Sequence, residues 1–294
     1  MDTAVKHRFQ HPVSSREARG CGEPRRGDDG VSDPAIRRGA PTQAQPSIGT
    51  RSRNKDAEAD AKQRALMERL FGTIAGRYDR FNAIVSASLD RRWRARAIAQ
   101  ALGEHPLPQA RVLDLCTGTG DIALEFTRHL NGRSRIVGLD VSEPMLRLAR
   151  QKAQRLGAQV EWLRGDALHL PFPDCSFDCV TIGFSTRNVP DLRAACEEMC
   201  RVLRPQGRLV ILEAGKPQSR WIQAGYYTYL YTVMPLIGFL VCGALWPFQY
   251  LRRSIATFLT PPAFSALLRD VGFASVAHLP CHGGIADLFV AVRP

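Results

Sequence analysis

The first 62 residues contain few large apolar side chains and show no helical or strand periodicity. They are rich in Arg, Gly, Pro, Ser and Asp instead. A segment of this composition cannot bury enough apolar surface to offset the entropy that it loses on ordering. We therefore expect residues 1–62 to form a disordered basic tail and residues 63–294 to form the folded domain.

No apolar stretch of the kind found in secretory signal peptides follows Met1. Organellar transit peptides are basic but poor in acidic residues, whereas Asp2, Glu17 and Glu23 interrupt this tail. Organellar import is therefore the alternative, and we expect a cytoplasmic protein.

Acidic residues do not balance the basic ones, because 28 Asp and Glu stand against 40 Lys and Arg, a formal net charge of +12. A basic protein is attracted to anionic lipid surfaces or to nucleic acid. The sequence shows no motif typical of nucleic-acid binding. We therefore expect no nucleic-acid partner, and we expect peripheral association with the anionic inner face of a membrane.

Two cysteine pairs with the spacing C-x₃-C, Cys175/Cys179 and Cys196/Cys200, raise the alternative of a zinc site. However, Cys179 lies in an apolar run typical of a strand, and Cys196 and Cys200 are one helical turn apart on a face that must pack. Buried thiols behave as small apolar residues. We expect no bound metal.

From residue 111 onward the sequence alternates between short apolar runs and amphipathic segments. Strands are expected at 111–116, 135–140, 158–166, 176–184 and 208–215, with helices at 121–130, 142–157 and 191–207 between them. Nearly continuous apolar strands in this order predict an open α/β fold with a parallel sheet covered on both faces. A helical segment at 63–105 precedes it, and a helix at 260–273 and strands at 275–281 and 286–294 follow it. Ligands of such a sheet bind at the C-terminal ends of its strands.

A glycine turn, VLDLCTGTGDIALEF (112–126), lies between a predicted strand and a predicted helix. Gly118 and Gly120 allow a ligand to approach the backbone closely, and Asp140, about 20 residues further on, can hold a ribose diol. An NAD enzyme and an S-adenosylmethionine enzyme would both show this pattern, and a tight turn without a ligand is a third alternative.

Two acidic residues beside this turn separate the alternatives. Asp114 lies in the strand, where its charge would repel a pyrophosphate but would attract the ammonium group of S-adenosylmethionine. Asp121 opens the helix and adds negative charge there, although its alternative role is to stabilise the helix N-terminus. The pattern favours S-adenosylmethionine.

Several segments resemble the ubiquinone/menaquinone biosynthesis C-methyltransferase family of class I S-adenosylmethionine-dependent methyltransferases: RYDRFN (77–82), VLDLCTGTGD (112–121), GLDVSEPML (138–146), RNVPD (187–191) and YLRRSI (250–255). The resemblance covers about residues 64–284. It implies a Rossmann-like, mostly parallel seven-stranded sheet with helices on both faces and an antiparallel last strand.

The resemblance also implies positions for the cofactor S-adenosylmethionine. It places Gly118 and Thr119 in the cofactor loop, Asp140 on the ribose hydroxyls, and Asp166 with Ala167 beside the adenine. A Ser is often found in the family at the position of Gly183. Because Gly183 has no hydroxyl, this implied cofactor contact lacks its usual hydrogen-bonding group.

The implied reaction is methylation of a ring carbon of a prenylated quinol, either demethylmenaquinol or 2-polyprenyl-6-methoxy-1,4-benzoquinol. An activated methyl group needs no metal, but the quinol must lose a proton to become a carbon nucleophile. We expect Arg187 to stabilise the quinolate, Asn188 to bind the ring oxygen and Tyr78 to orient the ring. A structural ion pair is the alternative role of Arg187, and core packing that of Tyr78.

An apolar run at 231–248 is long enough for a minimal transmembrane helix. Pro235, Gly238 and Gly243 interrupt it, and a span would separate the last helix and strands from the sheet. We expect residues 218–255 to form a lid that binds the polyprenyl tail and dips into the membrane surface. Residues at the headgroup level would be Trp246, Tyr250, Arg252 and Arg253.

Several alternatives stay open. The chain could be a catalytically silent scaffold of a quinone-biosynthesis complex, a methyltransferase for another lipid phenol, or an NAD dehydrogenase. The C-terminal HGGIADLFVAVRP lacks the His that commonly follows the glycine pair in the family. Other quinone-biosynthesis enzymes and a second copy of the chain are the further expected partners.

Overall fold

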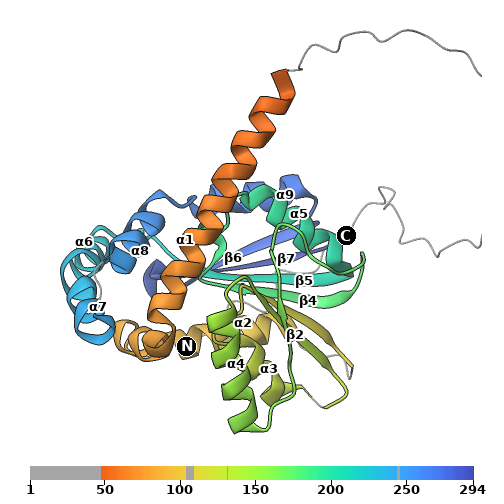
Figure 1. The fold of residues 1–294 in the computed structure, drawn as a ribbon, viewed down its shortest axis with the longest axis horizontal. Coiled ribbons are helices and arrows are strands. Elements are labelled where there is room, and N and C mark those ends of the chain that lie inside the picture. The colour runs from red at the N-terminus through yellow and green to blue at the C-terminus, as the bar shows by residue number, and fades with distance from the viewer. Residues whose placement is uncertain (1–47, 104–108, 131, 244–245) are drawn as a thin grey trace, which may run out of the picture. The chain divides into compact units, whose positions relative to one another are not determined.

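A computed structural model describes residues 48–103, 109–130, 132–243 and 246–294, which hold a mixed seven-stranded sheet (Figure 1). The strand order is β3-β2-β1-β4-β5-β7-β6. The strands are β1 Arg111–Leu115, β2 Arg135–Asp140, β3 Glu161–Arg164, β4 Phe177–Gly183, β5 Leu203–Ala214, β6 Ser275–Cys281 and β7 Ala286–Val292. Strands β1 to β5 pair in parallel, and β7 pairs antiparallel with both β5 and β6. The predicted fold class and antiparallel last strand are confirmed.

Nine helices lie within the described part of the chain, several of them against the sheet. They are α1 Ile48–Val85, α2 Leu89–Leu102, α3 Asp121–His129, α4 Glu143–Leu156, α5 Leu192–Val202, α6 Arg220–Thr228, α7 Met234–Cys242, α8 Trp246–Thr257 and α9 Pro261–Val271. Helices α2 and α3 pack on one face of the sheet, and α5 and α9 pack on the other (Figure 1).

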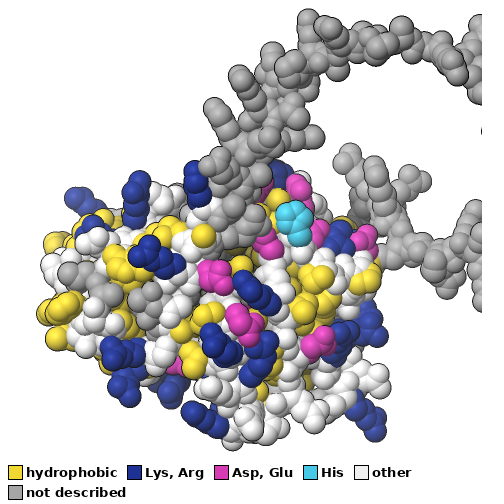
Figure 2. All heavy atoms as spheres, in the orientation of Figure 1, with side chains coloured by type: hydrophobic (Ala, Val, Ile, Leu, Met, Phe, Trp, Pro, Cys, Tyr) yellow, Lys and Arg dark blue, Asp and Glu magenta, His cyan; other side chains and the backbone are white. Residues whose placement is uncertain are grey.

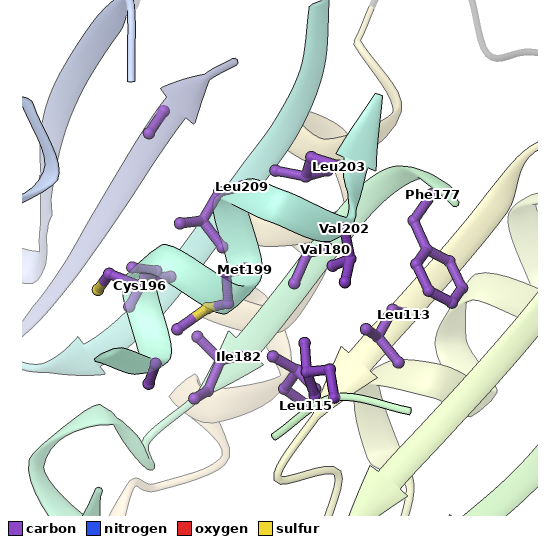
Figure 3. Packing of buried hydrophobic residues seen from close by; sticks show 14 of the residues in the cluster. Leu113, Leu115, Phe177, Val180, Ile182, Cys196, Met199, Val202, Leu203 and Leu209 are labelled. Atoms are coloured by element: carbon purple, nitrogen blue, oxygen red, sulfur yellow. The ribbon is translucent and has the colours of Figure 1, made fainter. Parts of the chain in front are cut away.

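The central strand β1 is buried on both faces, as its apolar run predicts. Leu113 and Leu115 belong to the core on the α5 side, whereas Val112 belongs to the core on the α2 side. Figure 3 shows Met199 of α5 beside Ile182 of β4 within the first of these cores. Alternate strand residues point to opposite faces, so Asp114 lies on the α2 and α3 side.

The N-terminal helix starts earlier than expected. Helix α1 begins at Ile48, inside the stretch 1–62 that composition predicts to lack regular structure. The sequence from 55 to 70 is rich in Ala, Glu, Lys and Arg, which have high helix propensity. Residues 1–47, which make up the rest of the predicted tail, lie outside the described residues. The predicted helical segment 63–105 is divided at residues 86–88, where Ala87 and Ser88 have positive φ.

The predicted helix at 191–207 is too long. Helix α5 ends at Val202, and β5 begins at Leu203, which pairs with Phe177 of β4. Pro205 explains the difference, because a proline disfavours helical backbone at the residue before it and removes an N–H group.

The apolar run at 231–248 is not one helix. Helix α7 ends at Cys242, and Gly243 follows it in the left-handed conformation with φ 74°. The continuous helical stretch Arg220–Cys242 is nevertheless long and apolar enough to cross a membrane, and 17% of its most apolar window is buried.

Candidate active site

A cavity lies at the C-terminal ends of β1, β2 and β4, where the α/β fold predicts a ligand site. Of the residues that the sequence assigns to the cofactor, those that line this cavity are Asp114, Gly118, Thr119, Asp140, Asp166, Ala167 and Gly183. The strand order thus brings together residues that are far apart in the sequence.

Asp114 is buried within the sheet at the base of the cavity. Thr181 is its partner across the parallel strands and donates a hydrogen bond to Oδ1 at 2.7 Å. Thr117 donates to Oδ2 at 2.5 Å. Burial raises the pKa of Asp114 to about 6, although both hydroxyls favour the ionised form. The carboxylate is therefore oriented by two hydroxyls and placed to attract a cationic group.

The glycine turn binds the carboxylate of Asp140 through its backbone. The Gly118 N–H donates to Oδ2 at 2.8 Å, and the Ser142 N–H donates to Oδ1 at 2.8 Å. Burial raises the pKa of Asp140, and these N–H groups act in the opposite direction. A carboxylate oxygen can accept more than one hydrogen bond, so Asp140 can still accept from two ribose hydroxyls.

The two glycines of the turn have different roles. Gly118 has φ 57°, and a Cβ atom there would meet no atom within 4 Å, which leaves its backbone open to a ligand. Gly120 does not line the cavity, and a Cβ atom there would lie 2.5 Å from the Trp162 ring. Gly120 therefore allows the start of α3 to pack against β3.

Thr119 faces an ionic network that joins four helices. Its hydroxyl donates to Asp79 of α1 at 2.6 Å, and Lys152 of α4 contacts both residues. Lys152 also pairs with Asp121 of α3, which pairs with Arg94 of α2 at 2.7 Å. This network holds α1 against the glycine turn.

Asp166 and Ala167 lie in the loop after β3. The Leu168 N–H donates to Asp166 Oδ1 at 3.0 Å, which fixes the carboxylate at the edge of the cavity. At Gly183, an added Cβ atom would lie 2.6 Å from Ile122 Cδ1, so Ile122 occupies the volume of a side chain there. Ser185, which the sequence reasoning missed, also lines the cavity and offers a hydroxyl two residues further on.

Arg187 forms a buried ion pair with Glu213 at the end of β5. The side chains are 7% and 1% exposed. Thr186 donates to Glu213 Oε2 at 2.6 Å, and the Ala214 N–H donates to Oε1 at 2.8 Å. The structural ion pair is therefore present, and sequence reasoning missed Glu213. Its only signal is an acidic residue at the end of the apolar run RLVILEAG (208–215).

A second, larger cavity of about 550 Å³ adjoins the first. It is lined mainly by apolar and aromatic residues of α1, α2, α6 and α8, together with Arg187. Four residues line both cavities: Tyr78, Arg94, Phe184 and Asn188. Tyr250 of α8 donates to Asn188 Oδ1 at 3.2 Å, and burial raises the pKa of Tyr78. Of the three residues expected to be catalytic, Tyr78 and Asn188 therefore lie at the junction of the two cavities, and Arg187 lines the second cavity.

Of the four paired cysteines, Cys179 and Cys196 are buried as expected, whereas Cys175 and Cys200 are half-buried. Cys179 lies in β4 and Cys196 in α5, and burial raises the pKa of Cys196 to about 12. Metal-binding cysteines are thiolates, whereas this environment favours the thiol. Within the described residues, no group of three or more His, Cys, Asp or Glu could hold a metal ion.

The chain resembles known proteins in sequence and in fold. Demethylmenaquinone methyltransferase of Thermus thermophilus is 42% identical over 225 residues, covering 76% of this chain and all of that protein. Ubiquinone/menaquinone biosynthesis C-methyltransferase UbiE of Rickettsia massiliae is 34% identical, covering 78% of this chain and 93% of that protein.

The solved structures show the same fold at low sequence identity. A phosphoethanolamine N-methyltransferase of Haemonchus contortus in complex with S-adenosyl-L-methionine has a TM-score of 0.51 and 15% identity, covering 69% of this chain and 52% of that one. An S-adenosylmethionine-dependent methyltransferase of Aquifex aeolicus has a TM-score of 0.50 and 19% identity, covering 68% and 89%.

The model of one family, described as the ubiE/COQ5 methyltransferase family, matches residues 58–293. The carboxylates, open glycine backbone and apolar walls of the first cavity fit a cofactor with a ribose, an adenine and a cationic amino-acid end. The family match and this fit to S-adenosylmethionine overturn the NAD dehydrogenase alternative. The chain belongs to the ubiE/COQ5 methyltransferase family, and it is an enzyme that uses S-adenosylmethionine as its cofactor.

Proposed function

We propose that the protein methylates a ring carbon of a prenylated quinol in menaquinone or ubiquinone biosynthesis. The observation that carries this proposal is the 550 Å³ apolar cavity next to the cofactor cavity. Its size is typical of small-molecule sites, and its aromatic and aliphatic lining suits a ring with an oily tail. Relatives named demethylmenaquinone methyltransferase and UbiE support the same substrate class.

The bound cofactor supplies a methyl group that its sulfonium already activates. The protein must therefore hold the quinol ring in line and favour its deprotonated form. Tyr78 and Asn188 lie at the junction of the two cavities, where the reacting carbon would face the cofactor. In this proposal Tyr78 orients the ring and Asn188 hydrogen-bonds a ring oxygen.

Arg187 stabilises the quinolate as a hydrogen-bond donor rather than as a free charge. The ion pair of Arg187 with Glu213 carries little net charge. A guanidinium stays protonated in proteins, so it cannot act as the base that deprotonates the quinol. However, the buried Nε atom of Arg187 has no hydrogen-bond partner among the described residues. A ring oxygen, or a water between the ring and Arg187, would satisfy this donor and stabilise the developing negative charge.

The surface of the lid, residues 218–255, is evidence for a substrate that lies in a membrane. Large apolar side chains on its surface are exposed, including Trp221 at 89% and Leu240 at 73%. No acidic residue occurs between Glu213 and Asp270. Figure 2 shows hydrophobic side chains among Lys and Arg on the side of the view where α6 to α8 lie. These features favour a cytoplasmic enzyme that binds an anionic membrane surface peripherally.

The substrate is tested with methyl-labelled S-adenosylmethionine and purified protein, given reduced demethylmenaquinone or a reduced methoxy-benzoquinone precursor. We expect label in at least one quinol, with demethylmenaquinol first because the more similar relatives carry that name. Bound cofactor without label in either quinol would contradict the proposal. That outcome would favour another lipid phenol or the scaffold alternative.

The lid is tested by extracting membranes with alkaline carbonate. If the lid binds the membrane only peripherally, carbonate should release the protein. If only detergent releases the protein, the apolar segment spans the membrane. Replacing Trp221 and Leu240 by Ser should lower co-sedimentation with anionic vesicles, and unchanged co-sedimentation would contradict this surface.

A further inference from the structure

The cofactor cavity is rich in carboxylates and contains one cationic side chain. Its acidic lining residues are Asp114, Asp121, Asp140 and Asp166. Among the described residues that line it, Arg94 is the only Lys or Arg. The methionine end of S-adenosylmethionine carries an ammonium group and a carboxylate group. The lining offers several carboxylates to the ammonium group, but Arg94 is the one charged side chain in it that can bind the carboxylate.

Two ion pairs hold the guanidinium of Arg94 in place. Nη1 lies 2.7 Å from Asp121 Oδ2, and Nη2 lies 3.0 Å from Asp90 Oδ2. Ser86 donates to Asp90 Oδ1 at 2.8 Å and so fixes the second carboxylate. The Arg94 side chain is only 15% exposed. An arginine held this way loses little conformational freedom when it binds a ligand.

The two ion pairs leave donors for a ligand. A guanidinium has five N–H groups, and the two pairs with Asp121 and Asp90 do not use them all. Arginine binds carboxylates through charge-assisted hydrogen bonds with defined geometry. Lys152 pairs with Asp121 as well but does not line the cavity.

We infer that Arg94 binds the α-carboxylate of the cofactor's methionine end, while Asp114 attracts its ammonium group. Arg94 is therefore a specificity-determining residue, because it selects a cofactor that carries the complete amino-acid end. The inference rests on the cofactor that the family uses and not on which quinol is methylated.

The test compares binding of S-adenosylmethionine with binding of its decarboxylated analogue, which keeps the ammonium and lacks only the carboxylate. Calorimetry on the full chain without quinol gives both dissociation constants. We expect the unaltered protein to prefer S-adenosylmethionine by about 10- to 100-fold, the usual range for a charge-assisted hydrogen bond. In Arg94→Gln this preference should fall to about 1–3-fold, while Arg94→Lys should keep an intermediate value.

Arg91→Gln is the matched control, because Arg91 is exposed one turn earlier on the same helix. It should leave the preference unchanged. The ratio of two affinities does not depend on the fraction of protein that is folded, so a less stable Arg94→Gln still reports the contact. The inference would be overturned if Arg94→Gln weakened the binding of S-adenosylmethionine and of its decarboxylated analogue equally. It would also be overturned if the preference stayed unchanged and only the KM for quinol rose. Absence of quinol methylation would contradict the proposed substrate and leave this ratio unaffected.

Discussion

Glu213 at the end of β5 and Arg187 in the loop after β4 form an ion pair that is almost fully buried. The strands β4 and β5 are neighbours, so their loops meet at the same edge of the sheet. Glu213 also accepts hydrogen bonds from Thr186 and the Ala214 N–H. Its carboxylate therefore fixes the loop that carries Arg187 and Asn188.

Replacing Glu213 by Gln should therefore cost both stability and turnover. The change leaves the buried Arg187 cation without its partner, which typically costs about 3–5 kcal/mol. Urea unfolding measures the stability, and the labelled assay measures turnover. The exposed Glu197→Gln on α5 is the control and should change neither. A fully stable Glu213→Gln with normal turnover would show that the pair does not hold the loop.

Replacing Arg187 by Lys separates charge from hydrogen-bond geometry. Lysine keeps the pairing charge for Glu213 but lacks the planar guanidinium with its Nε–H. We expect turnover to fall at least about tenfold, which corresponds to about 1.4 kcal/mol, while the dissociation constant of S-adenosylmethionine stays within about twofold. Parallel losses in turnover and cofactor affinity would assign Arg187 a structural role only.

Cofactor affinity should rise with pH around the pKa of Asp114. This pKa is raised from 3.8 to about 6 by burial, so the carboxylate is mostly protonated at pH 5 and ionised at pH 7. Only the ionised form attracts the ammonium group of the cofactor. Asp140, whose pKa burial also raises, acts in the same direction. Calorimetry from pH 5 to pH 8 should show this rise, and Asp114→Asn should weaken binding and flatten it.

The raised pKa of Asp114 affects the stability of the fold in the opposite direction, because stability should fall as the pH rises. Between pH 3.8 and about 6 the folded protein holds a proton that the unfolded chain has lost. The raised pKa therefore costs about 3 kcal/mol of stability once the pH exceeds both values. Asp114→Asn should recover part of this above pH 6 in urea unfolding. A less stable Asp114→Asn at pH 7 would contradict the assigned cost of burial.

Gly238 of α7 should not tolerate a side chain. A Cβ atom there would lie 2.2 Å from the ring of Phe248, which packs on Phe81 at 4.4 Å between ring centroids. Gly238→Ala should cost about 1–3 kcal/mol by overpacking and should disturb the wall of the apolar cavity. Gly76→Ala in α1 is the matched control, because a Cβ atom there meets no atom within 4 Å. Equal melting temperatures for the two variants would contradict this packing.

The order of strands and loops explains what the sequence could predict. Asp114, Gly118 and Asp140 follow or end neighbouring apolar strands, and the C-terminal ends of parallel strands meet at one edge. These residues therefore lie together as expected. The switch from helix to strand at Leu203 depends on Pro205 and on pairing with Phe177, which a helical pattern does not contain.

Contacts between distant segments could not be predicted. Arg94 looks like one of several basic residues on an amphipathic helix, and only the packing of α2 against α3 brings it into the cofactor cavity. Gly120 matches a ligand-binding pattern, yet its missing side chain makes room for Trp162. The partner of Arg187 is likewise visible only once β4 and β5 are adjacent.

The position of the transferred methyl group tests the central proposal most directly. The protein is incubated with S-adenosylmethionine carrying a ¹³C-methyl group and with the quinol that accepts label, and the product is analysed by NMR. The proposal predicts a ¹³C-methyl group bonded to a ring carbon beside a hydroxyl. A methyl group on a quinol oxygen would contradict it, because the site would then be built for O-methylation.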